Sequence, residues 1–223
     1  MASYRNGPAR KNKVPEIRFN TRDVFAAACA AQRVNGEYLK QGEHDDEGEL
    51  KRVANKYLTR DFVEGKFDIR DEDREEAENV IRHFQGLTFK ILQGKILSEF
   101  ATKALECANS ETVSTYELAM ISSLPSCYLR DKIRRDVDAR LRDTNGHVGQ
   151  VGDAVQLTIE VLRCNYSQQW STWFITGITT DNKSVFFSFK RLVATGSTMN
   201  IQGKVKSHCE DTVRTQLNYV KEI

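Results

Sequence analysis

Apolar residues follow two different periods along this chain. Between about residues 21 and 142 they recur at three- and four-residue spacing, which is typical of amphipathic helices. In the last third they alternate with polar residues, as in the segment VGDAVQLTIEVLRC. The residues on one face of that segment are Val155, Leu157, Ile159 and Val161. This alternation predicts a half-buried β-strand.

Four more strands are expected, in the runs WSTWFITGITT, SVFFSFKRL, MNIQGKVKSH and RTQLNYVKEI. A turn at Asp181-Asn182 separates the first two of these runs. We expect the five strands to follow one another as a meander over residues 148–223. That length suits a small closed barrel of the oligonucleotide-binding (OB) type. Such barrels bind single-stranded nucleic acid with aromatic rings and a basic groove.

The first helix is predicted over Thr21–Val34, capped by Asn20 or Thr21 and ended by Asn35-Gly36. The acidic stretch 41–49 is predicted as a loop. Further helices are expected over Leu50–Leu58, from Asp71 to a stop at Gly94, over Ser98–Asn109, over Thr115–Leu124, and from a cap at Ser126 to Asn145-Gly146. Pro125 is expected to break the chain between the last two helices.

The sequence therefore predicts an α+β fold with two domains. Residues 17–145 form an all-helical domain of five or six helices, and residues 148–223 form a five-stranded OB-fold-like β-barrel. Residues 1–16 are polar and basic and contain two prolines, so we expect a flexible arm. Two interpretations of this arm stay open: a terminus without a role, or a segment that contacts nucleic acid.

Composition narrows the class of protein. The chain has 223 residues, of which 39% are hydrophobic and 29% charged, as in an ordinary folded protein. No apolar run approaches the ~18 residues of a membrane span, so no membrane partner is expected. The five cysteines include no CxxC pair, which favours reduced thiols in a cytosol-like compartment. We expect no metal and no other cofactor, since adjacent His208 and Cys209 on a strand point to opposite faces.

Charge is unevenly distributed along the chain. Residues 1–22 carry six Lys or Arg against one acid, residues 23–147 carry 19 against 24, and residues 148–223 carry eight against six. An acidic middle between two basic parts does not suit a protein that coats duplex DNA. It indicates small basic surfaces with few phosphate contacts.

Aromatic residues in the predicted barrel are candidates for stacking on bases. Alternation places Trp170, Phe174 and Ile178 on one face of the second strand, and Trp173 with Ile175 on the other. On the third strand, a core face of Val185, Phe187 and Phe189 would leave Phe186 and Lys190 pointing outward together. An aromatic ring beside a cation is typical of single-strand binding. The alternative is that every ring lies in the core or against the helices.

Basic residues of the barrel are candidates for phosphate contacts. Lys204 and Lys206 leave one face of the fourth strand, because Val205 separates them. The alternative is a solvated edge that discourages aggregation. The full basic set comprises Lys190, Arg191, Lys204, Lys206 and Arg214.

Two other groups favour structural explanations. The helix SCYLRDKIRRDVDARLRD carries six basic residues with interspersed aspartates, which is typical of a solvated face with i,i+4 pairs; a helix-turn-helix is the weaker interpretation. The acids Asp68, Asp71, Glu72, Asp73, Glu75 and Glu76 lie at a helix start, where the helix dipole favours them. The sequence contains no GxxxxGK[ST], GxSxG or HExxH motif, so we expect no enzyme and no catalytic residue.

The strand segments WSTWFITGITTDNKSVFFSFKR, GSTMNIQGKVKSH and RTQLNYVKEI resemble a C-terminal module of bacteriophage proteins. The matching residues are Gly196, Ile201, Gly203, Val205, Lys206, His208, Thr215, Leu217, Val220 and Lys221. Tyr219 stands where the module has a basic residue, so the likeness does not extend to a phosphate contact there. The resemblance covers residues 148–223 and implies an OB-like barrel of phage replication or recombination. It also implies the cytoplasm of an infected bacterial host.

These observations predict a non-enzymatic accessory protein of phage DNA metabolism. The barrel would bind single-stranded DNA or RNA, and the acidic helical domain would bind a replication, recombination or transcription protein. The alternative is a protein-interaction subunit of a viral complex, or an inhibitor of a host enzyme, without nucleic-acid binding. The candidate nucleic-acid-binding residues are Trp170, Trp173, Phe186, Lys190, Arg191, Lys204, Lys206, His208 and Arg214.

Overall fold

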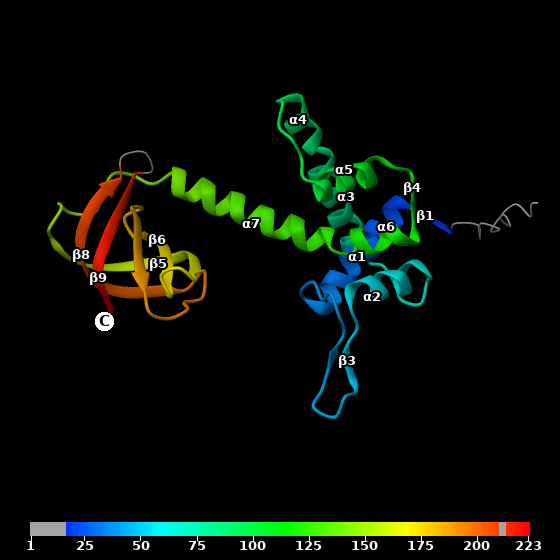
Figure 1. The fold of residues 1–223 in the computed structure, drawn as a ribbon, viewed down its shortest axis with the longest axis horizontal. Helices are drawn as coiled ribbons and strands as arrows, with labels where there is room; N and C mark the ends of the chain where they lie inside the picture. Colours follow the sequence, from blue (N-terminus) through cyan, green and yellow to red (C-terminus); the bar gives the residue numbers. More distant parts are fainter. Residues whose placement is uncertain (1–16, 210–212) are drawn as a thin grey trace, which may run out of the picture. The chain divides into compact units, whose positions relative to one another are not determined.

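A computed structural model describes residues 17–209 and 213–223. The chain divides into two compact units, Met1–Asp131 and Lys132–Ile223. The division falls within one helix, whose last turns belong to the second unit (Figure 1). The arm predicted over residues 1–16 lies outside the described residues.

The first unit is mainly helical. Its elements are β1 (Arg18–Asn20), α1 (Thr21–Asn35), β2 (Glu43–His44), β3 (Leu50–Arg52), α2 (Asn55–Val63), α3 (Asp71–Gln85), α4 (Leu87–Leu92), α5 (Glu99–Asn109), β4 (Thr112–Ser114), α6 (Thr115–Ile121) and the start of α7 (Leu124–Arg142). The two pairs β1–β4 and β2–β3 are short antiparallel ribbons. In the described part of the chain, no helix is long and apolar enough to cross a membrane.

The prediction for α1 is confirmed, including both of its ends. The Asn20 side chain accepts hydrogen bonds from the backbone N–H groups of Arg22 and Asp23, at 2.9 and 3.3 Å. Gly36 ends the helix in the left-handed conformation, with φ of 73°, and donates its N–H to the Gln32 carbonyl. An Asn cap and a left-handed glycine are the sequence signals that identified this helix.

Two helix predictions are wrong. The helix expected to run from Asp71 to Gly94 is divided into α3 and α4 at Gly86, whose N–H bonds to the carbonyls of Arg82 and Phe84. The helix expected over Leu50–Leu58 begins later, because residues 50–52 form β3. Arg52 fixes that ribbon through two hydrogen bonds to Glu43, at 2.7 and 2.8 Å. The stretch 41–49, predicted as a loop, contributes β2 to the same ribbon.

Pro125 starts a helix instead of separating two. It lies in the first turn of α7, directly after Leu124. A proline is tolerated there because the first N–H groups of a helix have no intrahelical partner. Ser126 is consequently inside the helix and is not its cap.

The core of the first unit forms around α1, which is buried along nearly its whole length and packs against α2 and α3. Phe25 is fully buried at its centre. At the edge of this core Arg33 holds the buried carboxylate of Asp73 with two hydrogen bonds, at 2.8 and 2.9 Å. The backbone N–H of Arg70 donates a third, at 3.0 Å. Burial alone would raise the pKa of the Asp73 carboxyl. The hydrogen bonds from Arg33 and Arg70 together lower this pKa by more than burial raises it, so the net pKa lies below its ordinary value.

Asp73→Asn is expected to destabilise the first unit by about 2 kcal/mol at pH 7, because it removes the buried carboxylate that Arg33 binds through two hydrogen bonds and leaves Arg33 only the exposed carboxylate of Glu72, at 3.5 Å. A carboxylate with a lowered pKa stabilises the fold above its ordinary pKa, and that contribution is lost as pH falls through the lowered value. The variant should therefore show a flatter loss of stability below about pH 4. Urea unfolding followed by far-UV circular dichroism at pH 3 to 7 measures both effects. The control is Glu75→Gln, because Glu75 is an exposed acid of the same helix. Equal stability of Asp73→Asn and wild type across this pH range would contradict the stabilising role of the Asp73 carboxylate.

The second unit contains the end of α7 and a closed five-stranded barrel (Figure 1). Its strands are β5 (Ala154–Ser167), β6 (Thr172–Thr179), β7 (Ser184–Phe189), β8 (Thr198–Cys209) and β9 (Arg214–Glu222). The barrel order is β5-β6-β7-β9-β8, with β8 pairing back to β5. The five predicted strands and the closed barrel are confirmed, but the meander is wrong. After β7 the chain crosses to β5, and β9 then fills the gap, running parallel to β7.

Alternation along the strands fills the barrel interior. Ile175, Val185, Phe187, Ile201 and Leu217 are at most 1% exposed and belong to one apolar cluster. The residues that precede and follow them in each strand face outward, because successive side chains of a β-strand point to opposite faces. Three bulges interrupt the alternation, one on β5 and two between β8 and β9. The confirmed core face of β7 leaves Phe186 on the outer surface.

Candidate nucleic-acid interface

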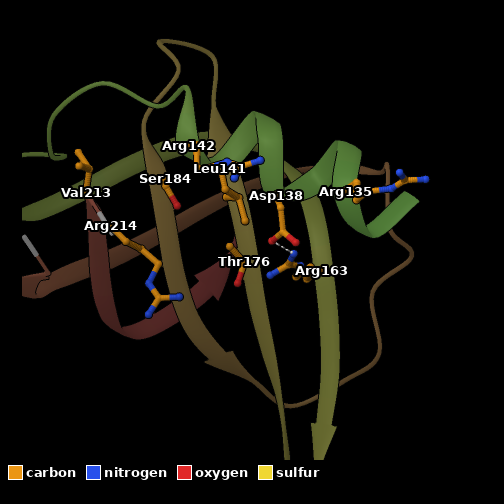
Figure 2. A pocket seen from close by; sticks show the side chains of 9 residues that line it. All are labelled: Arg135, Asp138, Leu141, Arg142, Arg163, Thr176, Ser184, Val213 and Arg214. Carbon is orange, nitrogen blue, oxygen red and sulfur yellow. Dashed lines mark hydrogen bonds and ion pairs between the residues drawn. The ribbon is translucent and has the colours of Figure 1, made fainter. Parts of the chain in front are cut away.

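The outer face of β6 and β7 is covered at one end and open at the other. Towards the turn that joins the two strands, Ile178 and Ser184 are paired neighbours, and both are buried although they point away from the barrel interior. Towards the opposite end, Phe174 and Phe186 are half-buried and Ser188 is exposed. Figure 2 shows α7 crossing over the covered part of the strands.

A pocket of about 550 Å³ lies where α7 passes over the barrel (Figure 2). The helix contributes Arg135, Asp138, Leu141 and Arg142 to its lining. Positions 135, 138 and 142 are three and four residues apart, so they follow one face of the helix. That face brings charged side chains to the outer surface of the barrel.

The barrel side of the pocket adds two more arginines. Arg163 comes from β5 and Arg214 from the start of β9, with the hydroxyl groups of Thr176 and Ser184 between them. The parallel pairing of β7 with β9 sets Ser184 directly opposite Arg214. Guanidinium and hydroxyl groups are the donors that proteins use to bind phosphate oxygens.

Two ion pairs attach α7 to β5. Arg140 binds Glu160 through two hydrogen bonds of 2.8 and 2.7 Å, and Arg163 donates to Asp138 at 2.5 Å. The hydrogen bond from Arg163 lowers the pKa of the Asp138 carboxyl, and the charges of Arg163, Arg134 and Arg142 lower it further. The carboxylate thus lies among several positive charges.

Positive charge dominates the pocket. Its lining includes four arginines and a single carboxylate, that of Asp138. Asp138 pairs with Arg163, whereas Arg142 and Arg214 form no ion pair with any carboxylate in residues 17–209 and 213–223. An anion entering the pocket would therefore meet two guanidinium groups that form no ion pair within the described residues.

An aromatic surface adjoins the pocket. The rings of Phe174 and Phe186 are nearly parallel, with centroids 5.5 Å apart and an interplanar angle of 7°. The guanidinium of Arg214 lies 4.7 Å from the centroid of the Phe186 ring, in cation–π geometry. Arg214 therefore belongs both to the pocket and to the aromatic surface.

Strand register gives the order of groups along this face. Thr176 in the pocket pairs across the strands with Phe186, and Phe174 pairs with Ser188. The end of β7 next to Lys190 lies at the same end of the barrel as the β5–β6 turn, because Trp173 pairs with Phe189. From Ser184 to Lys190 the face extends roughly 20 Å, at about 3.3 Å per residue. It runs from arginines through stacked rings to an exposed lysine.

The structure brings together only some of the sequence-predicted residues. Phe186 and Arg214 are in contact, and Lys190 is exposed beyond the end of β7. Trp170 is 67% exposed, in the turn between β5 and β6. Trp173 lies on the inward side of β6 and packs against Tyr166, with ring centroids 5.1 Å apart.

Arg191, two residues beyond the end of β7, forms an ion pair with Glu222, and its guanidinium lies 5.7 Å from the Phe189 ring centroid. Its charge is thus offset by a partner on β9.

The residues predicted on β8 lie elsewhere. Lys204 and Lys206 are exposed, but β8 is separated from β6 by β5 and from β7 by β9. His208 is half-buried, stacked on His147 at 4.4 Å, with its Nε2 3.3 Å from the Val148 carbonyl oxygen. One strand, β9, therefore separates these three residues from Phe186 on β7.

Sequence reasoning missed three contributors to the candidate interface. Phe174 was placed on the correct face but was not paired with Phe186, because only strand register shows that the two rings are neighbours. Arg142 was attributed to a solvated helix face. Arg163 lies two residues after the core residue Val161, so strict alternation would point its side chain into the barrel. The β-bulge between the two residues turns Arg163 outward instead. A bulge leaves no reliable mark in a single sequence.

Comparison with known proteins does not assign the chain to a family. No family model matches the chain, and neither a curated protein nor a solved structure gave a significant match. The resemblance to phage modules stays a prediction. In the described residues, no three His, Cys, Asp or Glu side chains gather closely enough to hold a metal ion.

Proposed function

We propose that this protein is a non-enzymatic accessory factor that binds single-stranded nucleic acid on the outer face of β6, β7 and β9. The observation that carries the proposal is the Phe174–Phe186 pair with Arg214 over one ring, next to an arginine-lined pocket. Base stacking on such rings is worth about 1–3 kcal/mol per base. The arginines supply the phosphate contacts that affinity for nucleic acid requires.

The topology of the barrel supports an OB-type fold. Strands β8, β5, β6 and β7 lie in the spatial order fourth, first, second, third, which is the Greek-key arrangement. A fifth strand closes the sheet, and the OB-fold is a five-stranded Greek-key barrel. In that fold the second and third strands carry the ligand-binding face. Here those strands are β6 and β7, which hold the stacked rings.

Single strands fit this face better than a duplex. Stacking on Phe174 and Phe186 requires unpaired bases with exposed faces. The overall formal charge is only +2, and few cations lie on the face, so it can neutralise few phosphates. Nothing on the face selects a ribose 2′-hydroxyl over its absence, so both DNA and RNA remain in the proposal.

Fluorescence anisotropy of an end-labelled dT oligonucleotide, titrated with the full chain at low salt, tests the proposal. We expect a dissociation constant in the micromolar range or below, since one stacked base and a few phosphate contacts suffice for it. Failure to bind at low salt would overturn the proposal and favour the second candidate.

The second candidate is a protein-interaction subunit that binds no nucleic acid. A cluster of apolar side chains exposed around α4 favours it: Phe89, Ile91, Leu92, Ile96 and Phe100. Ile96 is 99% and Leu92 76% exposed, and in Figure 1 α4 projects from the other helices of its unit. Contiguous exposed apolar side chains are typical of interaction sites. The same surface would serve a replication, recombination or transcription partner in the first proposal; the phage setting and the bacterial host stay predictions.

A further inference from the structure

At one end, helix α7 closes off the proposed binding face. Along the outer surface of β6 and β7, burial increases from exposed Ser188 through half-buried Phe186 to Ser184, which is 1% exposed. Leu141 and Arg142 of α7 line the pocket at that end, over Thr176 and Ser184 (Figure 2). A strand that stacks on the two rings and continues in this direction meets the helix, which two ion pairs hold against β5.

The positive charge of the pocket under α7 exceeds the negative charge of one internal phosphate. An internal phosphodiester carries a single negative charge, whereas a terminal phosphate monoester carries about −1.5 to −2 at neutral pH and has three strong acceptor oxygens. Two guanidinium groups of its lining, those of Arg142 and Arg214, form no ion pair with a carboxylate of the described residues, whereas Arg163 pairs with Asp138. The hydroxyl groups of Thr176 and Ser184 face the same space.

We propose that the arginine pocket binds the terminal phosphate of a single strand, so that the protein recognises phosphorylated ends. This proposal rests on the proposed single-strand binding. The first bases stack on Phe186 and Phe174, and the phosphate at the end enters between α7 and the barrel. The ligand is a phosphate monoester at the 5′ or the 3′ end, since both present the same dianion.

The test uses the full chain and four dT oligonucleotides of equal length, each with an internal fluorophore. One carries a 5′-phosphate, one a 3′-phosphate, one has hydroxyl groups at both ends, and one is circular. We expect one phosphorylated form to bind about tenfold tighter than the form with hydroxyl ends, because the dianion gains charge-assisted hydrogen bonds. The circular form should not exceed the form with hydroxyl ends.

Arg142→Gln should abolish the preference for the phosphorylated end, because it removes a pocket guanidinium that forms no ion pair with a described carboxylate. Arg130→Gln removes the same charge from an earlier turn of α7, outside the pocket, and should keep the preference. Far-UV circular dichroism checks that both variants fold.

The outcomes separate this inference from the proposed function. Equal affinity of wild type for all four oligonucleotides would overturn end recognition and leave single-strand binding intact. A preference that survives Arg142→Gln undiminished would overturn the assignment to this pocket. Absence of binding to every form would overturn the proposed function and this inference with it.

Discussion

Phe186→Ala is expected to weaken binding of a dT oligonucleotide about thirtyfold, which corresponds to about 2 kcal/mol of lost stacking. The ring is half-buried on the outer face, parallel to Phe174 and beneath the guanidinium of Arg214. Its removal takes away one stacking surface and frees Arg214 from its position. Anisotropy titrations of wild type and variant under one buffer condition measure the ratio.

Tyr219→Ala is the matched control for this variant. Tyr219 is 82% exposed on the same barrel, at a bulge of β9 that faces β8 and not β7. The substitution removes an aromatic ring of similar size that lies outside the proposed face. The affinity of Tyr219→Ala for the oligonucleotide should therefore stay within about twofold of wild type. Equal losses for the two variants, or no loss for Phe186→Ala, would contradict the location of the site.

Phe187→Ala is expected to destabilise the barrel by about 3–5 kcal/mol, because Phe187 is a large side chain in its closed interior. It is 1% exposed and meets Phe189 edge-to-face, with ring centroids 6.2 Å apart. Both tryptophans of the chain, Trp170 and Trp173, lie in the barrel unit. Urea unfolding followed by tryptophan fluorescence therefore reports on the barrel and not on the helices.

The neighbouring residue gives the comparison for this prediction. Phe186 is adjacent in sequence but points outward, so Phe186→Ala should cost clearly less than Phe187→Ala in the same assay. Similar losses for the two would mean that β7 does not have one core face and one outer face. That result would remove the basis for placing Phe186 at the surface.

The predictable parts of this fold are those whose signals are local. Asn20 and Gly36 mark the ends of α1, Ser98 caps α5, and alternation identifies all five barrel strands. These signals depend on hydrogen bonds and side-chain direction within a few residues, which the sequence states directly. The two-faced character of β7 follows from the same alternation.

The parts that were not predicted depend on contacts between distant segments. The return of β8 to β5 replaces the meander, because pairing order is decided by closure of the whole sheet and not by any one strand. The outward direction of Arg163 follows from a bulge, and the role of Arg142 depends on where α7 lies against β5. Of the predicted site residues, Phe186 and Arg214 are in contact, whereas Lys204 and Lys206 lie on β8, which β9 separates from β7.

The most direct test of the central claim is the salt dependence of binding to a dT oligonucleotide, compared with a duplex of the same length. If the outer face of β6, β7 and β9 binds a single strand through stacked rings and three or four arginines, affinity should fall with a log–log salt slope of about −2 to −3. The duplex should bind at least about tenfold more weakly, because its bases are not free to stack on Phe174 and Phe186. Equal affinity for the duplex, or no binding of the single strand at low salt, would contradict the account.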